Sequence, residues 1–230
     1  MSSDDQSETA PGSKKAQMGD KVYAKNVEFW VRAWASIKTP YTQMPKLSYL
    51  PDIPQNLEGY GLRKILDLGC GSGWLSVYLA RLGFSVTGVD IASQAIELAK
   101  TWAKQENLSI EFSVADIVDM DFPEGTFDAV VANAIFEHLT FDLAKECLSK
   151  IERFLIPGGV FVGCFDRVGG GPGEYYELAD GTHVYTDKGR LGMLLRFFDD
   201  NELKSMFADW TIDSFETEEN GTRVIWARKT

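Results

Sequence analysis

The stretch "ILDLGCGSGWLSVYLARLGFSVTGVD", which runs from Ile65 to Asp90, decides the fold. It contains, in order, an apolar run, a glycine-rich turn, an amphipathic stretch, a second apolar run and a terminal aspartate. Short apolar runs are typical of buried strands, and the pattern over Trp74–Leu82 is typical of a helix. The order predicts a βαβ unit, in which a crossover helix joins two parallel strands.

The same alternation continues along the chain. Further strands are predicted in "SIEFSVAD", "FDAVVANA" and "GGVFVGCFD", and further helices over Ser93–Gln105 and Phe141–Leu155. Near the C-terminus, two strand-like runs flank Asn220-Gly221, a strong hairpin signal. The sequence therefore predicts a Rossmann-like, doubly wound α/β fold with a mostly parallel seven-stranded sheet and a C-terminal antiparallel hairpin.

Three regions are predicted along the chain. Residues 1–18 are polar and read as a disordered tail. Residues 19–62 begin with a helical pattern and continue into a proline-rich connection, and residues 63–230 form the α/β domain. Within that domain, residues 168–196 form an insertion with little periodicity, and long segments of this kind often carry function.

Composition narrows the class of partner. The net charge is -11 and the pI is near 4.7, without a basic cluster, so no nucleic-acid partner is expected. No apolar run approaches the roughly 20 residues that cross a bilayer, so no membrane association is expected. The three cysteines are scattered, which predicts neither a disulfide framework nor a metal site, and suggests a cytoplasmic location.

The glycine-rich turn predicts a nucleotide-type ligand but leaves two classes open. A nicotinamide dinucleotide prefers G-x-G-x-x-G, whereas this turn is G-x-G-x-G with Trp74 where the third glycine would stand. Asp67 is a poor neighbour for a pyrophosphate and a good one for an ammonium group, which S-adenosylmethionine carries. Asp90 suits the ribose hydroxyls of either ligand.

Several ordered motifs resemble those of class I S-adenosylmethionine-dependent methyltransferases. They are "ILDLGCGSGW", "VTGVDIA", "VADIVDMDFPEGTFDAVVANAIFEHL" and "FLIPGGVFV", together with the end hairpin. The segments "FFDDNELKSMFADWTIDSFE" and "TRVIWARK" are similar, more loosely, to tellurite-resistance and thiopurine-type small-molecule methyltransferases. The resemblance implies S-adenosylmethionine as cofactor, S-adenosylhomocysteine as product, and an O, N or S nucleophile of a small molecule as methyl acceptor.

The resemblance also implies a cofactor site at the ends of the predicted strands. Its members are Asp67, Gly69, Gly71 and Gly73 for the methionine moiety, Asp90 for the ribose, Ile91 for the adenine ring, Asp116 and Ile117 for the adenine amino group and a backbone contact, and Asn133 with Ala134 for the transfer site. The competing interpretations are a ligand-free turn for the glycines, a helix cap for Asp90, and a simple turn for Asp116.

The helix before the first strand commonly folds over the cofactor in this family. Tyr23 and Trp30 are therefore expected to contact the cofactor, since aromatic faces attract a sulfonium cation, and Trp34 is expected to contact the acceptor. The competing interpretation is that these aromatic residues, at helical spacing, are core anchors.

The two histidines are the candidate catalytic residues. His138 follows a predicted strand at its carboxyl end and could act as a general base, or could only pack against the next helix. His183 lies in the insertion, and the residues named with it as acceptor-site candidates are Tyr175, Tyr176, Tyr185 and Arg196. The competing interpretation of the insertion is a solvated loop.

Two other functions stay open at the level of sequence. A nicotinamide-dependent oxidoreductase would use the same βαβ unit, and a non-catalytic scaffold protein could keep the cofactor fold without turnover. The expected assembly is a monomer or a homodimer.

Overall fold

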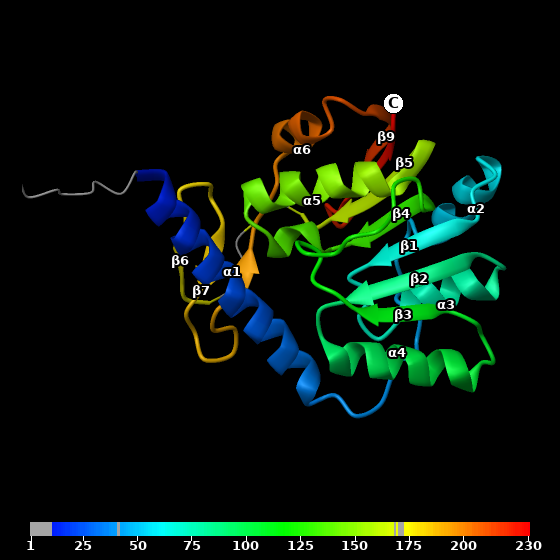
Figure 1. Cartoon of the computed structure of the whole chain (residues 1–230), viewed down its shortest axis with the longest axis horizontal. Helices are drawn as coiled ribbons and strands as arrows, with labels where there is room; N and C mark the ends of the chain where they lie inside the picture. Colours follow the sequence, from blue (N-terminus) through cyan, green and yellow to red (C-terminus); the bar gives the residue numbers. More distant parts are fainter. Residues whose placement is uncertain (1–10, 41, 168, 170–172) are drawn as a thin grey trace, which may run out of the picture.

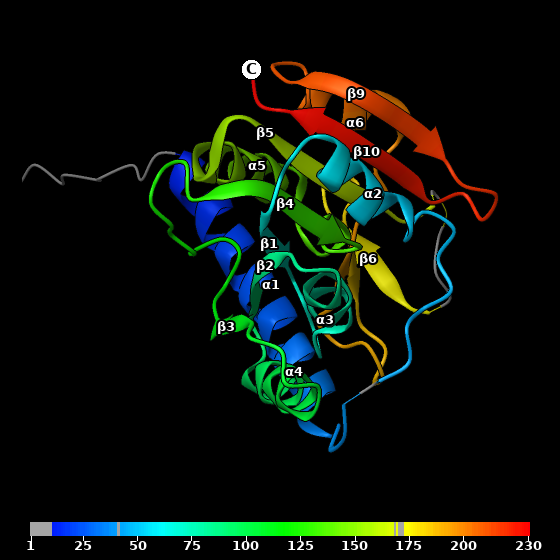
Figure 2. The ribbon, with the colours of Figure 1, turned by 90° about the vertical axis from the view of Figure 1, so that its right-hand side faces the viewer.

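The fold is described from a computed structural model for residues 11–40, 42–167, 169 and 173–230, without the side chains of residues 11–18 and 20. A seven-stranded sheet has the strand order β3-β2-β1-β4-β5-β10-β9. Only the two pairings made by β10 are antiparallel, which confirms the predicted mostly parallel sheet and terminal hairpin. Figures 1 and 2 show this sheet from two sides. The strands are β1 (Lys64–Leu68), β2 (Ser85–Asp90), β3 (Glu111–Val114), β4 (Phe127–Asn133), β5 (Leu155–Phe165), β9 (Thr211–Thr217) and β10 (Arg223–Arg228).

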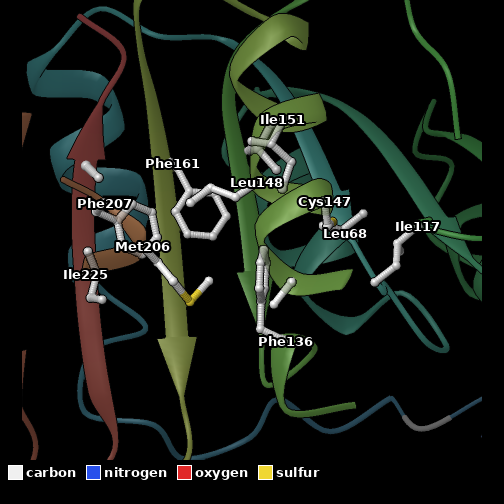
Figure 3. Close-up of a cluster of buried hydrophobic side chains, with 14 of the residues drawn as sticks. Leu68, Ile117, Phe136, Cys147, Leu148, Ile151, Phe161, Met206, Phe207 and Ile225 are labelled. Carbon is white, nitrogen blue, oxygen red and sulfur yellow. The ribbon is translucent and has the colours of Figure 1, made fainter. Parts of the chain in front are cut away.

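Helices cover both faces of the sheet, as the continuous apolar runs of the strands require. In β1, Leu66 and Leu68 face one hydrophobic cluster, whereas Ile65 faces the other. Leu148 of α5 and Phe161 of β5 meet in the first cluster, where Figure 3 shows α5 packed over the strands. Helices α5 (Phe141–Phe154) and α6 (Asp200–Met206) cover that face, α2 (Asp52–Gly59) and α3 (Trp74–Arg81) cover the other, and α4 (Ser93–Gln105) packs on β2 and β3.

The first helix is longer than the sequence predicts. Helix α1 spans Pro11–Ala35, so the predicted tail of residues 1–18 is wrong from Pro11 onward, and residues 1–10 lie outside the described residues. Proline is well tolerated at the first position of a helix, and the segment behind it has no apolar stripe that periodicity could detect. Within the described ranges, no helix is both long and apolar enough to cross a bilayer.

The insertion forms a small antiparallel sheet in the order β6-β7-β8, apart from residues 168 and 170–172, which lie outside the described residues. Strands of two or three residues are too short to show alternation, so the sequence predicts only a loop. Figure 1 shows this sheet beside α1. Val22 of α1 packs against Val184 and Leu194. The strands are β6 (Tyr175–Glu177), β7 (His183–Tyr185) and β8 (Leu194–Leu195).

Candidate active site

A pocket opens at the carboxyl ends of β1, β2 and β4, under helix α1. The strand order reverses between β1 and β4, and ligands of open α/β sheets bind at such a reversal. The pocket encloses about 710 Å³ including its open mouth, which suits a ligand of nucleoside size. The predicted residues that line it are Tyr23, Trp30, Trp34, Gly69, Gly71, Asp90, Ile91, Asp116, Ile117, Asn133, Ala134 and His138.

The glycine loop forms one wall of the pocket with its backbone. Gly69 has a φ of +69°, and a Cβ atom there would lie 2.5 Å from the Ile135 side chain. Gly73 differs, because it does not line the pocket and its Cβ would lie 2.9 Å from that of Ala99 in α4. Gly73 therefore allows close packing of the loop against α4, and its cofactor role stays a prediction.

Asp90 ends β2 and joins two segments of the pocket wall. The Gly71 N–H donates to Oδ2 and the Ala92 N–H donates to Oδ1, each at 2.9 Å. Burial raises the pKa of Asp90, while these backbone N–H groups oppose the shift. Since each carboxylate oxygen can accept more than one hydrogen bond, both retain capacity for a ribose diol. A cap of the following helix would not bond Gly71, which lies in the glycine loop, so Asp90 does more than cap that helix.

Asp116 follows β3 and is held by helix α1. The Tyr23 hydroxyl donates to Oδ1 at 2.7 Å, and the Val118 N–H donates to the same oxygen at 2.9 Å. Burial and the neighbouring carboxylate raise the pKa of Tyr23, so its hydroxyl stays a donor. Because both bonds go to Oδ1, Oδ2 is the oxygen oriented by them for a ligand amino group.

Asp67 is not among the pocket-lining residues, contrary to its predicted contact with the methionine moiety. It is 2% exposed beneath the glycine loop and accepts a hydrogen bond of 2.5 Å from the Ser76 hydroxyl of α3. Burial raises the pKa of Asp67 to about 7. Its position two residues before Gly69 in an alternating strand turns the side chain toward α3, so we assign it the role of supporting the loop.

His138 lies in the 3₁₀ turn Phe136–His138 and lines the pocket. Its Nδ1 lies 2.9 Å from the Leu194 carbonyl oxygen of β8. A carbonyl only accepts, so the neutral ring carries its proton on Nδ1 and keeps a lone pair on Nε2. Burial lowers the pKa of His138, and the Trp30 ring packs edge-on with centroids 4.5 Å apart. A neutral imidazole with a lone pair on Nε2 at the pocket is suited to act as a general base.

The other predicted acceptor residues lie outside the pocket lining. Arg196 is 4% exposed and pairs with Glu202 and Asp180, which compensates its buried charge. Its predicted role is therefore corrected to a structural one. Tyr185 is fully buried in a cluster with Phe29, which likewise makes it a packing residue.

The small sheet also holds the other histidine away from the pocket. His183 stacks on Tyr175 with ring centroids 3.9 Å apart, and Tyr176 is 48% exposed beside them. None of the three is among the residues that line this pocket, so their contacts with the acceptor stay predictions. The insertion instead contributes to the site through its backbone, at Leu194.

Two residues near the site escape prediction from sequence. Asn26 is a buried polar residue one turn after Tyr23 and one turn before Trp30, so its place on the apolar face of α1 is a usable signal. Tyr49 donates a hydrogen bond of 2.6 Å to the side-chain oxygen of Asn133. Tyr49 lies in the proline-rich connection, where no pattern singles it out.

The charges around the pocket favour a cationic ligand. Its lining contains the carboxylates of Asp90 and Asp116 and several aromatic faces, and no Lys or Arg among the residues the structure describes. Aromatic faces and carboxylates attract cations, whereas a pyrophosphate would lack a basic partner there. A sulfonium and ammonium compound therefore fits better than a nicotinamide dinucleotide.

Comparisons with known proteins agree with this geometry. Residues 65–159 match the model of a family described as "Methyltransferase domain". A ubiquinone biosynthesis O-methyltransferase from Methylocella silvestris is 40% identical over 109 residues, covering 46% of this chain and 40% of that protein. One of the same name from Xanthomonas campestris pv. campestris is 32% identical over 136 residues, covering 54% and 55%. The chain thus spans about half the length, or less, of these curated relatives.

A solved structure shows the same similarity to methyltransferases. It is a SAM-dependent methyltransferase from Methanosarcina mazei, 25% identical, with a TM-score of 0.60 over 72% of this chain and 92% of that one. The segment matched by the family model runs from β1 into β5 and holds the glycine loop, Asp90, Asp116 and His138. The part of the chain from β1 into β5 is therefore similar to a methyltransferase domain, and most of the chain shares its fold with a solved SAM-dependent methyltransferase.

Proposed function

We propose that this protein transfers a methyl group from S-adenosylmethionine to a hydroxyl oxygen of a small, neutral and largely apolar molecule. The observation that carries the proposal is the bond from His138 Nδ1 to the Leu194 carbonyl, which leaves Nε2 as a proton acceptor at the pocket. A base of this kind is useful for a hydroxyl, whose lone pair attacks better once the proton is removed.

Residues already in place would hold the cofactor. Asp90 would accept hydrogen bonds from the ribose hydroxyls, and Asp116 Oδ2 would accept one from the adenine amino group. The backbone of Gly69 and Gly71 would face the methionine moiety, beneath Trp34 of α1. When bound, S-adenosylmethionine supplies an electrophilic methyl group, whose bond to the sulfonium sulfur breaks as the acceptor oxygen bonds to it.

The lining near His138 supports a neutral, apolar acceptor. It consists of Val27, Trp30, Ile135 and Leu139, which offer no positive charge for a carboxylate or phosphate. The relatives' name, O-methyltransferase, supports oxygen over nitrogen or sulfur as the acceptor atom. A phenol meets both requirements, because its ring is apolar and its hydroxyl is more acidic than an alcohol.

The protein's own part in the step is positioning and proton removal. His138 Nε2 takes the proton of the acceptor hydroxyl, while Nδ1–H stays on Leu194 and stabilises the imidazolium that forms. Tyr23, Trp30 and Trp34 of α1 would cover the bound reactants and limit the access of water. Orienting the two reactants in one site can supply several kcal/mol of the barrier.

An acceptor panel tests the proposal directly. Purified protein is incubated with S-adenosylmethionine and separate phenols, catechols, amines, carboxylates and thiols, and products are identified by mass. We expect methyl ethers of the phenols or catechols, and binding of S-adenosylhomocysteine but not of NAD in calorimetry. Binding of S-adenosylhomocysteine with methylation confined to amines or thiols would overturn the oxygen assignment and keep the cofactor assignment.

The pH dependence of kcat provides a separate prediction. Burial lowers the pKa of His138 and outweighs the bond to Leu194 and the charge of Asp166, which both raise it. A base acts when it is unprotonated, so the active fraction falls only as the pH drops through this lowered pKa. We expect kcat to be flat through neutral pH and to fall below about pH 6.5, the ordinary histidine value. An acid limb centred well above that pH would contradict the assignment.

We also propose that the protein acts in the cytoplasm, as a monomer or a homodimer. The three cysteines, Cys70, Cys147 and Cys164, are buried free thiols, which a reducing compartment preserves. The acidic composition supports a small-molecule partner over a nucleic acid.

A further inference from the structure

Asn26 is a buried polar residue on the face of α1 that lines the pocket. Its side chain is 3% exposed, and both halves of its amide are used. The Nδ2 group donates to the His138 carbonyl oxygen at 2.9 Å, and Oδ1 accepts from the Leu194 N–H at 2.9 Å. The Asn26 amide therefore binds the N–H group of Leu194 in one segment and the carbonyl group of His138 in another.

A third hydrogen bond joins these segments directly and completes a network of three residues. The Leu194 carbonyl accepts from His138 Nδ1 at 2.9 Å, so that Asn26, Leu194 and His138 are each joined to the other two. The three residues come from α1, β8 and the 3₁₀ turn after β4, which lie far apart in sequence. The pairing of β8 with β7 and the bond from the Arg196 N–H to the Glu137 carbonyl at 2.7 Å bring β8 to the turn. The Asn26 amide adds the two bonds that orient the peptide groups of Leu194 and His138 toward each other.

We propose that Asn26 is a positioning residue, which holds the Leu194 carbonyl against His138 so that the imidazole carries its proton on Nδ1 and presents an unprotonated Nε2. This inference rests on the proposed function of His138 as a base. Without the Asn26 amide, the Leu194 N–H and the His138 carbonyl both lose a buried partner, and their segments must shift to find others. The tautomer with the proton on Nε2 then becomes populated, and it cannot accept a proton at that atom.

The network also connects the base to helix α1. Helix α1 carries Asn26 together with Tyr23, which bonds Asp116 at the adenine end, and Trp30, whose ring packs on His138. The Asn26 amide therefore joins the proposed base to the helix that covers the pocket.

Nitrogen NMR of the histidine rings tests the proposal in the full chain without any substrate. The chain contains only two histidines, and a His183→Asn variant assigns their signals. We expect wild-type His138 to show protonated Nδ1 and unprotonated Nε2 at neutral pH. A wild-type ring protonated on Nε2 would overturn the proposal whatever the variants do.

The variant that removes the amide is Asn26→Leu, which keeps the branching at Cγ and replaces both polar groups by methyl groups. We expect its His138 signals to move toward the Nε2-protonated form, and its kcat at saturating cofactor and acceptor to fall by about tenfold or more. The matched control is Glu28→Ala, an exposed position on the same helix, which should behave as wild type in both readouts. A fall in kcat with an unchanged tautomer signature would make Asn26 structural and refute the positioning role.

The failure of the proposed function is distinguishable from the failure of this inference. If wild-type protein methylates no hydroxyl compound, the function of His138 as a base fails, while the ring spectrum still reports whether Asn26 sets the tautomer. If methylation of hydroxyl compounds occurs and the ring spectrum does not respond to Asn26→Leu, only the inference about Asn26 fails.

Discussion

The His138→Asn variant is expected to lose about 10² to 10⁴-fold in kcat, which is the usual contribution of a general base. Asparagine can still donate a hydrogen bond toward the Leu194 carbonyl, as the histidine Nδ1 does, but it offers no group that takes a proton near neutral pH. The fold and the cofactor contacts of the pocket should therefore survive. The measurement is kcat at saturating S-adenosylmethionine with the phenol selected from the panel, together with the affinity for S-adenosylhomocysteine.

The matched control is His183→Asn in the other histidine. His183 stacks on Tyr175 in the small sheet and is not a pocket-lining residue, so its replacement should leave kcat near the wild-type value. A His138→Asn enzyme that keeps wild-type kcat would show that the acceptor loses its proton without this residue. A large loss in the His183 variant instead would move the acceptor site toward the insertion.

The second large effect is expected from Asp90→Ala, through cofactor affinity. The substitution removes the acceptor for the ribose hydroxyls and leaves the N–H groups of Gly71 and Ala92 without their partner. Charge-assisted hydrogen bonds of this kind contribute about 3 kcal/mol, which predicts roughly a hundredfold increase in Kd for S-adenosylhomocysteine. Isothermal titration calorimetry measures this directly.

Asp128 provides a control with the same local chemistry at the other end of the sheet. It accepts hydrogen bonds from the backbone N–H groups of Arg63 and Lys64, each at 2.8 Å. Asp128→Ala should lower the unfolding temperature without changing the Kd. If Asp90→Ala and Asp128→Ala change the affinity equally, the effect comes from global destabilisation and the ribose assignment is refuted.

Much of the fold follows from short-range pattern. The first strand and the helix that begins at Trp74 lie where periodicity predicts them, because both faces of the sheet bury apolar side chains. The hairpin at Asn220-Gly221 forms because that turn needs positive φ, and Gly221 has a φ of +87°. The strands of the insertion carry no such signal, since each has only two or three residues.

The predictions for the site likewise match the pocket where a local sequence signal exists and are weaker where none exists. Residues at strand ends, such as Asp90 and Asp116, are brought to the pocket because parallel strands end at one edge of the sheet. The acceptor contacts of residues in the insertion were predicted only because the loop is long, and the length of a loop does not determine where each side chain points. In the structure, Arg196 pairs with Glu202 in the interior instead of facing an acceptor.

The sequence by itself determined the sheet, the class of the domain and the place of the glycine loop and the strand-end acids that line the pocket. Periodicity, glycine geometry and the ends of strands are each encoded by a few neighbouring residues, so the sequence displays them directly. The tertiary structure alone decided which groups face the pocket and in what protonation state. Asn26, His138 and Leu194 acquire their roles only where α1, the turn after β4 and β8 meet. Hydrogen bonds between segments so distant in sequence depend on the packing of the whole domain, and no local pattern encodes them.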